Sequence, residues 1–124
     1  MTIEETIKAR PMPLKTKTLI NIMYTSRVVE EVMANLLKEY ELSSQQFNVL
    51  RILRGQNGKP ASLFTIQERM VDRNSNTTRL VDKLIKKELV ARRICPHNRR
   101  KVEITITKKG EELLKALDPQ TMQL

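Results

Sequence analysis

The segment LVARRICPHNRRKVEITIT, which spans residues 89–107, decides the fold that we expect for this chain. Both of its halves have the composition of a strand, and between them lie a proline, a polar pair and three consecutive cations. From Val102 to Ile106, apolar residues alternate with polar ones, as in a strand with one buried face. The segment therefore predicts a β-hairpin with a cationic tip and with strands over residues 90–94 and 101–106.

The residues before the hairpin have the apolar periodicity of helices. A stretch without Gly or Pro from 14 to 40 predicts one long helix, and residues 2–10 predict a short helix before it. The long helix has more apolar surface than one small lobe can cover. We therefore expect it to pair with a helix of a second subunit.

Helix-capping signals locate the other helices. Ser43 and Gln46 have the spacing of a capping box, so a helix should start there and stop near Gly55. Further helices should start at residues whose side chains cap well, namely Ser62, Asn74 or Ser75, Thr107 and Asp118. The helix after Asn74 or Ser75 should cover about 76–89, and Pro119 should hold the first position of a final helix.

Basic residues are concentrated in the hairpin and in the helix before it. The net charge of the chain is +9, but residues 1–50 hold six basic and six acidic residues. Residues 73–101 hold ten Lys and Arg against two Asp and Glu. This imbalance predicts a neutral scaffold joined to a surface that binds a polyanion. A solvated basic face that only maintains solubility is the alternative.

A mainly α-helical chain with one small, basic-tipped β-hairpin has the element order of a winged helix-turn-helix. In that architecture the second helix of the turn enters the major groove of DNA, and the hairpin, or wing, lies beside it. The helix over about 76–89 suits this role because Leu80 and Leu84 share one face and Lys83 lies on the other. Arg79 lies in its first turn, where an arginine can contact a guanine edge.

The segments SNTTRLVDKLIKKELV and PHNRRKVEITITKKGEELL resemble the core of the MarR family of bacterial transcriptional regulators. The resemblance covers about residues 40–117. It rests on Ser75, Thr78, Arg79, Asp82, Arg100, Val102, Ile106, Thr107 and Gly110. It implies a cytoplasmic homodimer that binds a pseudo-palindromic operator on double-stranded DNA, and a ligand-responsive repressor.

The resemblance also implies how a single domain over residues 1–124 is organised. Residues 1–42 would form scaffold and dimerisation helices, and residues 43–107 the winged helix-turn-helix, with its wing at about 90–106. Residues 108–124 would begin the C-terminal helices that help to pair the subunits. We expect this last part to be truncated, because the family's closing helix continues further.

DNA contacts are expected from the recognition helix and the wing. The candidate residues are Ser75, Asn76, Thr78, Arg79, Lys83, Lys86, Arg99, Arg100 and Lys101. By resemblance Arg100 is the wing arginine, which we expect in the minor groove, with its neighbours closer to phosphates. A small aromatic ligand could bind near Met23 and Tyr24, although ordinary packing is the alternative for these two residues.

Two positions depart from the family's pattern. Asn98 stands where the family has Asp, so the wing arginine should be held less firmly. Glu88 stands where a glycine is expected after the recognition helix. A residue other than glycine there costs about 1 kcal/mol in a left-handed conformation, or it changes the turn.

Other functions have weaker support in the sequence. One His, one Cys and no convergent carboxylates argue against an enzyme or a metal site, and no cofactor is expected. Cys95 is expected to be a strand residue, with a redox-sensing thiolate as the alternative. A winged-helix module that binds RNA or a protein partner is the alternative function. However, the chain has no Trp, two Phe and two Tyr to stack on RNA bases.

Overall fold

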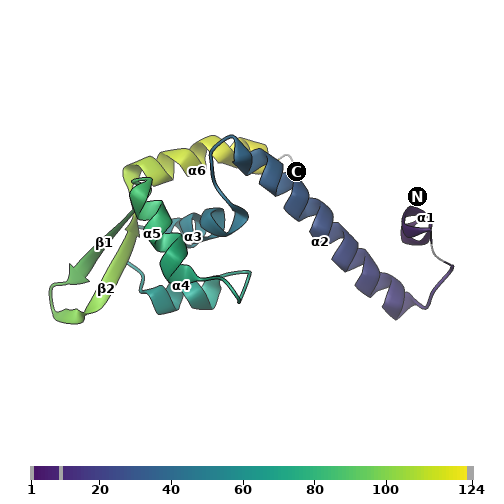
Figure 1. Ribbon diagram of the computed structural model, residues 1–124, viewed down its shortest axis with the longest axis horizontal. Coiled ribbons are helices and arrows are strands. Elements are labelled where there is room, and N and C mark those ends of the chain that lie inside the picture. The colour runs from purple at the N-terminus through teal and green to yellow at the C-terminus, as the bar shows by residue number, and fades with distance from the viewer. Residues whose placement is uncertain (1, 9, 123–124) are drawn as a thin grey trace.

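The computed structural model describes residues 2–8 and 10–122. It has two parts, a rounded lobe and a long helix that projects from it (Figure 1). The lobe contains α3–α6 and the two-stranded antiparallel sheet β1–β2, and the projecting helix is α2. The predicted class, mainly helical with one small hairpin, is confirmed.

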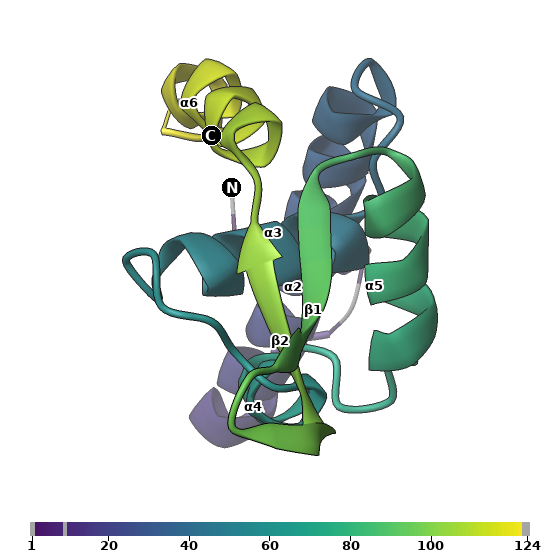
Figure 2. The same cartoon turned by 90° about the vertical axis from the view of Figure 1, so that its left-hand side faces the viewer.

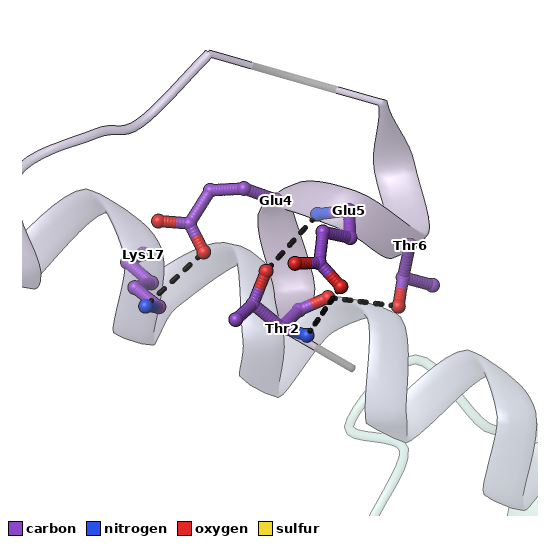
Figure 3. A network of polar contacts seen from close by, with 5 residues as sticks. All are labelled: Thr2, Glu4, Glu5, Thr6 and Lys17. Carbon is purple, nitrogen blue, oxygen red and sulfur yellow. Dashed lines mark hydrogen bonds and ion pairs between the residues drawn. The ribbon is translucent and has the colours of Figure 1, made fainter.

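Helix α2 covers Leu14–Lys38, close to the predicted range, and the short α1 (Ile3–Ile7) packs against its first half. Figure 3 shows the polar contacts within α1 and the ion pair that joins it to α2. The Thr2 hydroxyl accepts a hydrogen bond from the backbone N–H of Glu5, and Glu4 forms an ion pair with Lys17 at 3.1 Å. A backbone hydrogen bond and the bond from Lys17 lower the pKa of Glu4.

The lobe begins with α3 (Ser44–Arg54) and α4 (Leu63–Arg69). Both helices start directly after the capping residues that the sequence predicted. The Ser43 hydroxyl accepts from the backbone N–H of Gln46, whose side chain in turn accepts from the N–H of Ser43. The Ser62 hydroxyl accepts from the N–H of Thr65. These two starts are local interactions, which is why the sequence could locate them.

Helix α5 covers Thr77–Lys86 and is shorter than predicted at both ends. The predicted cap, Asn74 or Ser75, was wrong. The cap is Asn76, whose side-chain oxygen accepts from the N–H of Arg79 at 3.2 Å. Ser75 instead belongs to the preceding turn, where its N–H donates to the carbonyl of Asp72 at 3.2 Å.

The hairpin pairs β1 (Val90–Cys95) with β2 (Asn98–Ile106), so the second strand starts three residues before its predicted start. Its inner face is anchored by Ile104, which is fully buried. Ala61 extends the sheet through two hydrogen bonds with the backbone of Ile104, at 2.8 and 2.9 Å. The base of the hairpin is therefore fixed to the lobe.

Helix α6 covers Lys108–Thr121 and starts at the predicted cap, Thr107. The separate helix predicted from Asp118 was wrong, because α6 continues through Pro119. The Asp118 carboxylate does not cap a new helix; it accepts hydrogen bonds from Arg54. Gly110 is needed for packing, since a Cβ atom there would lie 2.4 Å from the carbonyl oxygen of Leu89.

The core of the lobe draws on every element from the end of α2 onward. Its largest fully buried side chains are Leu37, Val49, Leu50, Leu53, Ile66, Val81, Leu84, Ile104, Leu114 and Leu117. Because α3, α4, α5, the hairpin and α6 all contribute, the lobe has one contiguous core that positions its outer surface.

Candidate DNA interface

The outward side of α5 carries most of the residues that the sequence analysis assigned to the recognition helix. Leu80, Val81 and Leu84 are buried in the lobe, so the opposite side of α5 faces outward. Its exposed side chains are Thr78, Arg79, Lys83 and Lys86. Figure 2 shows α5 and the hairpin side by side, so that a single surface includes both.

Amide side chains from α3 and α4 fix the turn between α4 and α5. The Asn48 side chain on α3 is 8% exposed, and its oxygen accepts from the N–H of Val71 at 2.8 Å. Gln67 on α4 donates to the carbonyl of Arg73 at 3.1 Å and also bonds the hydroxyl of Thr77. The turn is therefore held from α3, α4 and α5, which orients the first turn of α5 rigidly.

Ser75 and Asn76 precede α5, and the structure gives them different environments. Ser75 is 9% exposed, and its hydroxyl has no hydrogen-bond partner among the described residues. Asn76 is exposed, although its side chain also caps the helix. The structure therefore groups Asn76 with the outward side chains of α5 and leaves Ser75 beneath them.

The end of α5 is a Schellman turn built around Glu88. The N–H of Glu88 donates to the carbonyl of Ile85 at 2.9 Å, and the N–H of Leu89 to that of Leu84 at 3.0 Å. Glu88 has φ 63°, the left-handed value for which a glycine was expected. The chain therefore keeps this turn without glycine, at a cost of about 1 kcal/mol.

An ion pair joins the recognition helix to the wing. Arg92 on β1 contacts Asp82 on α5 at 3.3 Å, and both side chains are about half exposed. The sequence analysis did not find this link, although Asp82 is one of only two acidic residues in the cationic segment 73–101. An acidic residue among so many cations was the feature of the sequence that could have indicated an ion pair. The pair neutralises a carboxylate that would otherwise repel a phosphate backbone.

A second ion pair lies across the two strands. Arg93 contacts Glu103 at 2.8 Å, and this hydrogen bond lowers the pKa of the Glu103 carboxyl. The two residues are cross-strand partners in the ladder. The pair therefore supports the pairing of β1 and β2 between the base of the hairpin and its tip.

The cationic tip is a bulge on β2. Ile94 pairs with Val102, but the next residue, Cys95, pairs with Asn98, so the register shifts by three residues on β2. The residues outside the regular pairing are Arg99, Arg100 and Lys101, and all three are exposed. This bulge projects three cations from the end of the wing.

The side chain of Asn98 bonds the backbone of the bulge. The Asn98 side-chain oxygen accepts from the backbone N–H of Arg100 at 3.0 Å, which is the geometry of an Asx turn. Because this bond uses the backbone N–H, it shapes the loop without occupying the guanidinium group. The expected looser hold on the arginine side chain remains a prediction.

The two candidate ligand residues lie in different surroundings. Met23 is 64% exposed on α2. Tyr24 is half-buried and lines a cavity of about 410 Å³ between α1 and α2, together with residues that include Thr2, Lys17 and Asn21. The structure therefore associates only Tyr24 with a cavity.

Two features are absent from the part of the chain that the structure describes. Over residues 2–8 and 10–122, no helix is long and apolar enough to cross a membrane. Within the same ranges, no group of three or more His, Cys, Asp and Glu side chains could hold a metal ion.

Comparisons with known proteins agree with this geometry. The MarR family model matches residues 42–102. A MarR transcription factor from Planctomyces limnophilus is 32% identical to this chain and superposes with a TM-score of 0.76. The match covers 92% of this chain and 82% of the other. The chain belongs to the MarR family. It is therefore a transcriptional regulator that binds DNA.

Two further solved structures share the fold at lower identity. BpsR from Bordetella bronchiseptica is 22% identical, with a TM-score of 0.75 over 92% of this chain and 80% of that one; 6-hydroxynicotinic acid regulates its DNA binding. A mutant of MepR from S. aureus, bound to an oligodeoxyribonucleotide, is 16% identical. Its TM-score is 0.69 over 86% of this chain and 76% of that one. No curated protein sequence matches the chain.

Proposed function

We propose that this MarR-family protein is a cytoplasmic repressor that binds a pseudo-palindromic operator as a homodimer. The observation that carries the proposal is the single outward surface formed by α5 and the wing, which the Asp82–Arg92 ion pair joins. A recognition helix and a wing held at a fixed angle can contact adjacent grooves at the same time.

In this proposal α5 lies in the major groove. Arg79 and Thr78 are exposed in its first turn, where side chains reach base edges. Arg79 would contact a guanine through two hydrogen bonds. Lys83 and Lys86 lie further along the exposed side and would contact phosphates, which gives affinity without sequence preference.

The wing would contact the minor groove through its bulge. Arg100 lies in the middle of the three unpaired cations and would enter the groove, while Arg99 and Lys101 would contact the flanking phosphates. Narrow A·T-rich minor grooves have the strongest negative potential and attract arginine. Replacing Arg100 with Ala should therefore reduce affinity more on A·T-rich flanks than on G·C-rich flanks.

A second copy of the chain would cover the apolar side of α2. Six large apolar side chains on this helix are 41–78% exposed, namely Leu14, Leu19, Ile22, Met23, Val29 and Val32. Such a stripe on a projecting helix favours pairing with the same helix of a partner around a two-fold axis. The two recognition helices would then meet successive major grooves, about 34 Å apart.

A ligand response belongs to the same proposal. The cavity beside Tyr24 lies between α1 and α2, so a small aromatic compound bound there would act on the proposed dimer scaffold. The regulation of BpsR by 6-hydroxynicotinic acid supports a compound of this class.

Selection of binding duplexes from a random pool tests the proposal. The expected product is an inverted repeat whose halves are about 10 base pairs apart, centre to centre. Fluorescence anisotropy then compares this duplex with hairpin RNA and single strands. Tighter binding to RNA, or no enriched repeat, would contradict the proposal and favour the alternative module.

A further inference from the structure

Four side chains connect the ends of three helices where α2 leaves the lobe. Arg54, on the last turn of α3, donates from one guanidinium nitrogen to both carboxylate oxygens of Asp118, at 3.1 and 2.9 Å. Gln120 donates to the hydroxyl of Tyr40 at 2.9 Å. We call Tyr40, Arg54, Asp118 and Gln120 the helix clasp. Tyr40 follows α2, and Asp118 and Gln120 lie on α6.

The clasp brackets the one proline inside α6. Pro119 has no N–H, so the helical hydrogen bond to the carbonyl four residues earlier cannot form. A helix bends most easily at such a point. Because Asp118 bonds α3 and Gln120 bonds Tyr40, the residues on both sides of the proline are fixed to the rest of the molecule.

The clasp lies where it can constrain the angle at which α2 leaves the lobe. Gln120, near the end of α6, bonds Tyr40 just beyond the end of α2, and Figure 1 shows the rest of α2 extending away from the lobe. Leu37 is fully buried at this point, but apart from it no residue of α2 is buried. Met33 and Leu36 pack, partly buried, against the same core, so α2 is anchored only near this end. The clasp adds a further constraint on the angle of the helix.

The length of α2 makes that angle important. A helix of 25 residues is about 37 Å long, so a tilt of about 5° at one end moves the other by about 3 Å. This displacement is close to the rise of roughly 3.4 Å per base pair in DNA. A small change at the clasp is therefore comparable to one base pair of half-site separation.

We infer that the helix clasp fixes the angle between α2 and the DNA-binding lobe and thereby sets the separation of operator half-sites that the dimer accepts. The inference rests on the proposed function, because it needs a dimer held by α2. Its residues are positioning residues; none lies on the outward surface of α5 or on the wing. The alternative is that the clasp only stabilises the fold.

The test uses the double variant Tyr40→Phe/Asp118→Asn, which removes a hydroxyl and a carboxylate charge with little change of shape. The control is Glu112→Gln, which removes an exposed carboxylate from the same helix. Anisotropy is measured on the selected operator, on operators with one or two base pairs inserted or removed between the halves, and on a single half-site. Light scattering and circular dichroism check the dimer and its helix content.

We expect the preference of the double variant for the native separation to fall by about fivefold or more, the lower end of coupling between linked sites. Its affinity for a single half-site should stay within about twofold of wild type. An unchanged separation preference would overturn the inference, as would an equal loss on every duplex. If the double variant loses helix content, Asp118→Asn alone is judged by the same criteria.

The proposed function is tested separately by the wild-type protein. A wild-type chain that is monomeric, or that binds all separations equally, contradicts the dimeric operator model and removes the basis of the inference. A wild-type dimer with a clear preference, together with unchanged variants, contradicts only the role of the clasp.

Discussion

Helices α5 and α2 are both amphipathic, yet they differ sharply in burial. Of the ten residues of α5, the four on its inner side are buried, and the outer side is free. Of the twenty-five residues of α2, only Leu37 is buried, and the apolar side is exposed along most of its length. The lobe can therefore hold α5 by itself, whereas it leaves the apolar side of α2 uncovered, which is the side that the proposed dimer would bury.

The largest expected effect breaks the proposed pairing of α2. Ile22→Asp places a charge in the apolar stripe and removes about 1.5–3 kcal/mol of burial in each copy. Light scattering at micromolar concentration should change from dimer to monomer. The control Asn35→Asp adds the same charge on the opposite side of α2 and should leave the mass unchanged. A dimeric Ile22→Asp variant would place the interface elsewhere.

A core truncation in α5 compares the two helices directly. Leu84→Ala removes a fully buried side chain and should reduce the free energy of unfolding by about 2–5 kcal/mol. Leu19→Ala, at a site that is 60% exposed, should not change the unfolding of the subunit and should act on dimer dissociation. Chemical denaturation over a range of protein concentrations separates the two effects. If both variants lost the same unfolding free energy at every protein concentration, the difference between α5 and α2 would be contradicted.

Within the outward side of α5, two substitutions distinguish base reading from phosphate contact. Arg79→Ala should weaken operator binding by about 1–3 kcal/mol and relax preference at one base pair. Lys86→Ala should weaken all duplexes about equally and reduce the salt slope by roughly one unit. Anisotropy on operator and random duplex at several salt concentrations measures both. An Arg79→Ala loss that is equal on both duplexes would make Arg79 a phosphate contact.

The smallest expected effect concerns the attachment of α1 to α2. The pKa of Glu4 is below its ordinary value of 4.5, so the folded state favours the carboxylate. This contribution is fully present above pH 4.5 and is lost as the pH falls through the lowered pKa. Protection of the α1 amides against exchange, relative to the intrinsic rate at each pH, should therefore fall below pH 4.5, and Glu4→Gln should remove that change. Identical profiles for both proteins would contradict this role of Glu4.

How much the sequence could predict depended on the range of the interactions involved. Ser43, Ser62 and Thr107 cap helices through bonds three residues away, so residue type and spacing were sufficient. The local signal failed where three capping residues followed one another before α5. There the bonds of Gln67 and Asn48 to the turn decide that Asn76, not Asn74 or Ser75, caps α5.

Contacts between distant residues could not be predicted. Asp118 before a proline is a good local cap, but it lies beside Arg54, which is 64 residues away in the sequence. The Asp82–Arg92 pair likewise depends on how the wing packs against α5. Cationic residues of the candidate interface were easier to find, because exposed cations on α5 follow from helical periodicity alone. The burial of Ser75 could not be predicted, because it depends on how the turn before α5 folds.

The register shift on β2 has a consequence for how such regulators diversify. The regular ladder of the wing ends at the pair Ile94–Val102, and the bulge lies beyond it. Changes in the length or charge of residues 95–101 would therefore leave the pairing of the base, and the lobe beneath it, undisturbed. This seven-residue segment can therefore be exchanged as a unit. Transplanting it between related proteins should transfer flank preference while the parent's fold stays intact.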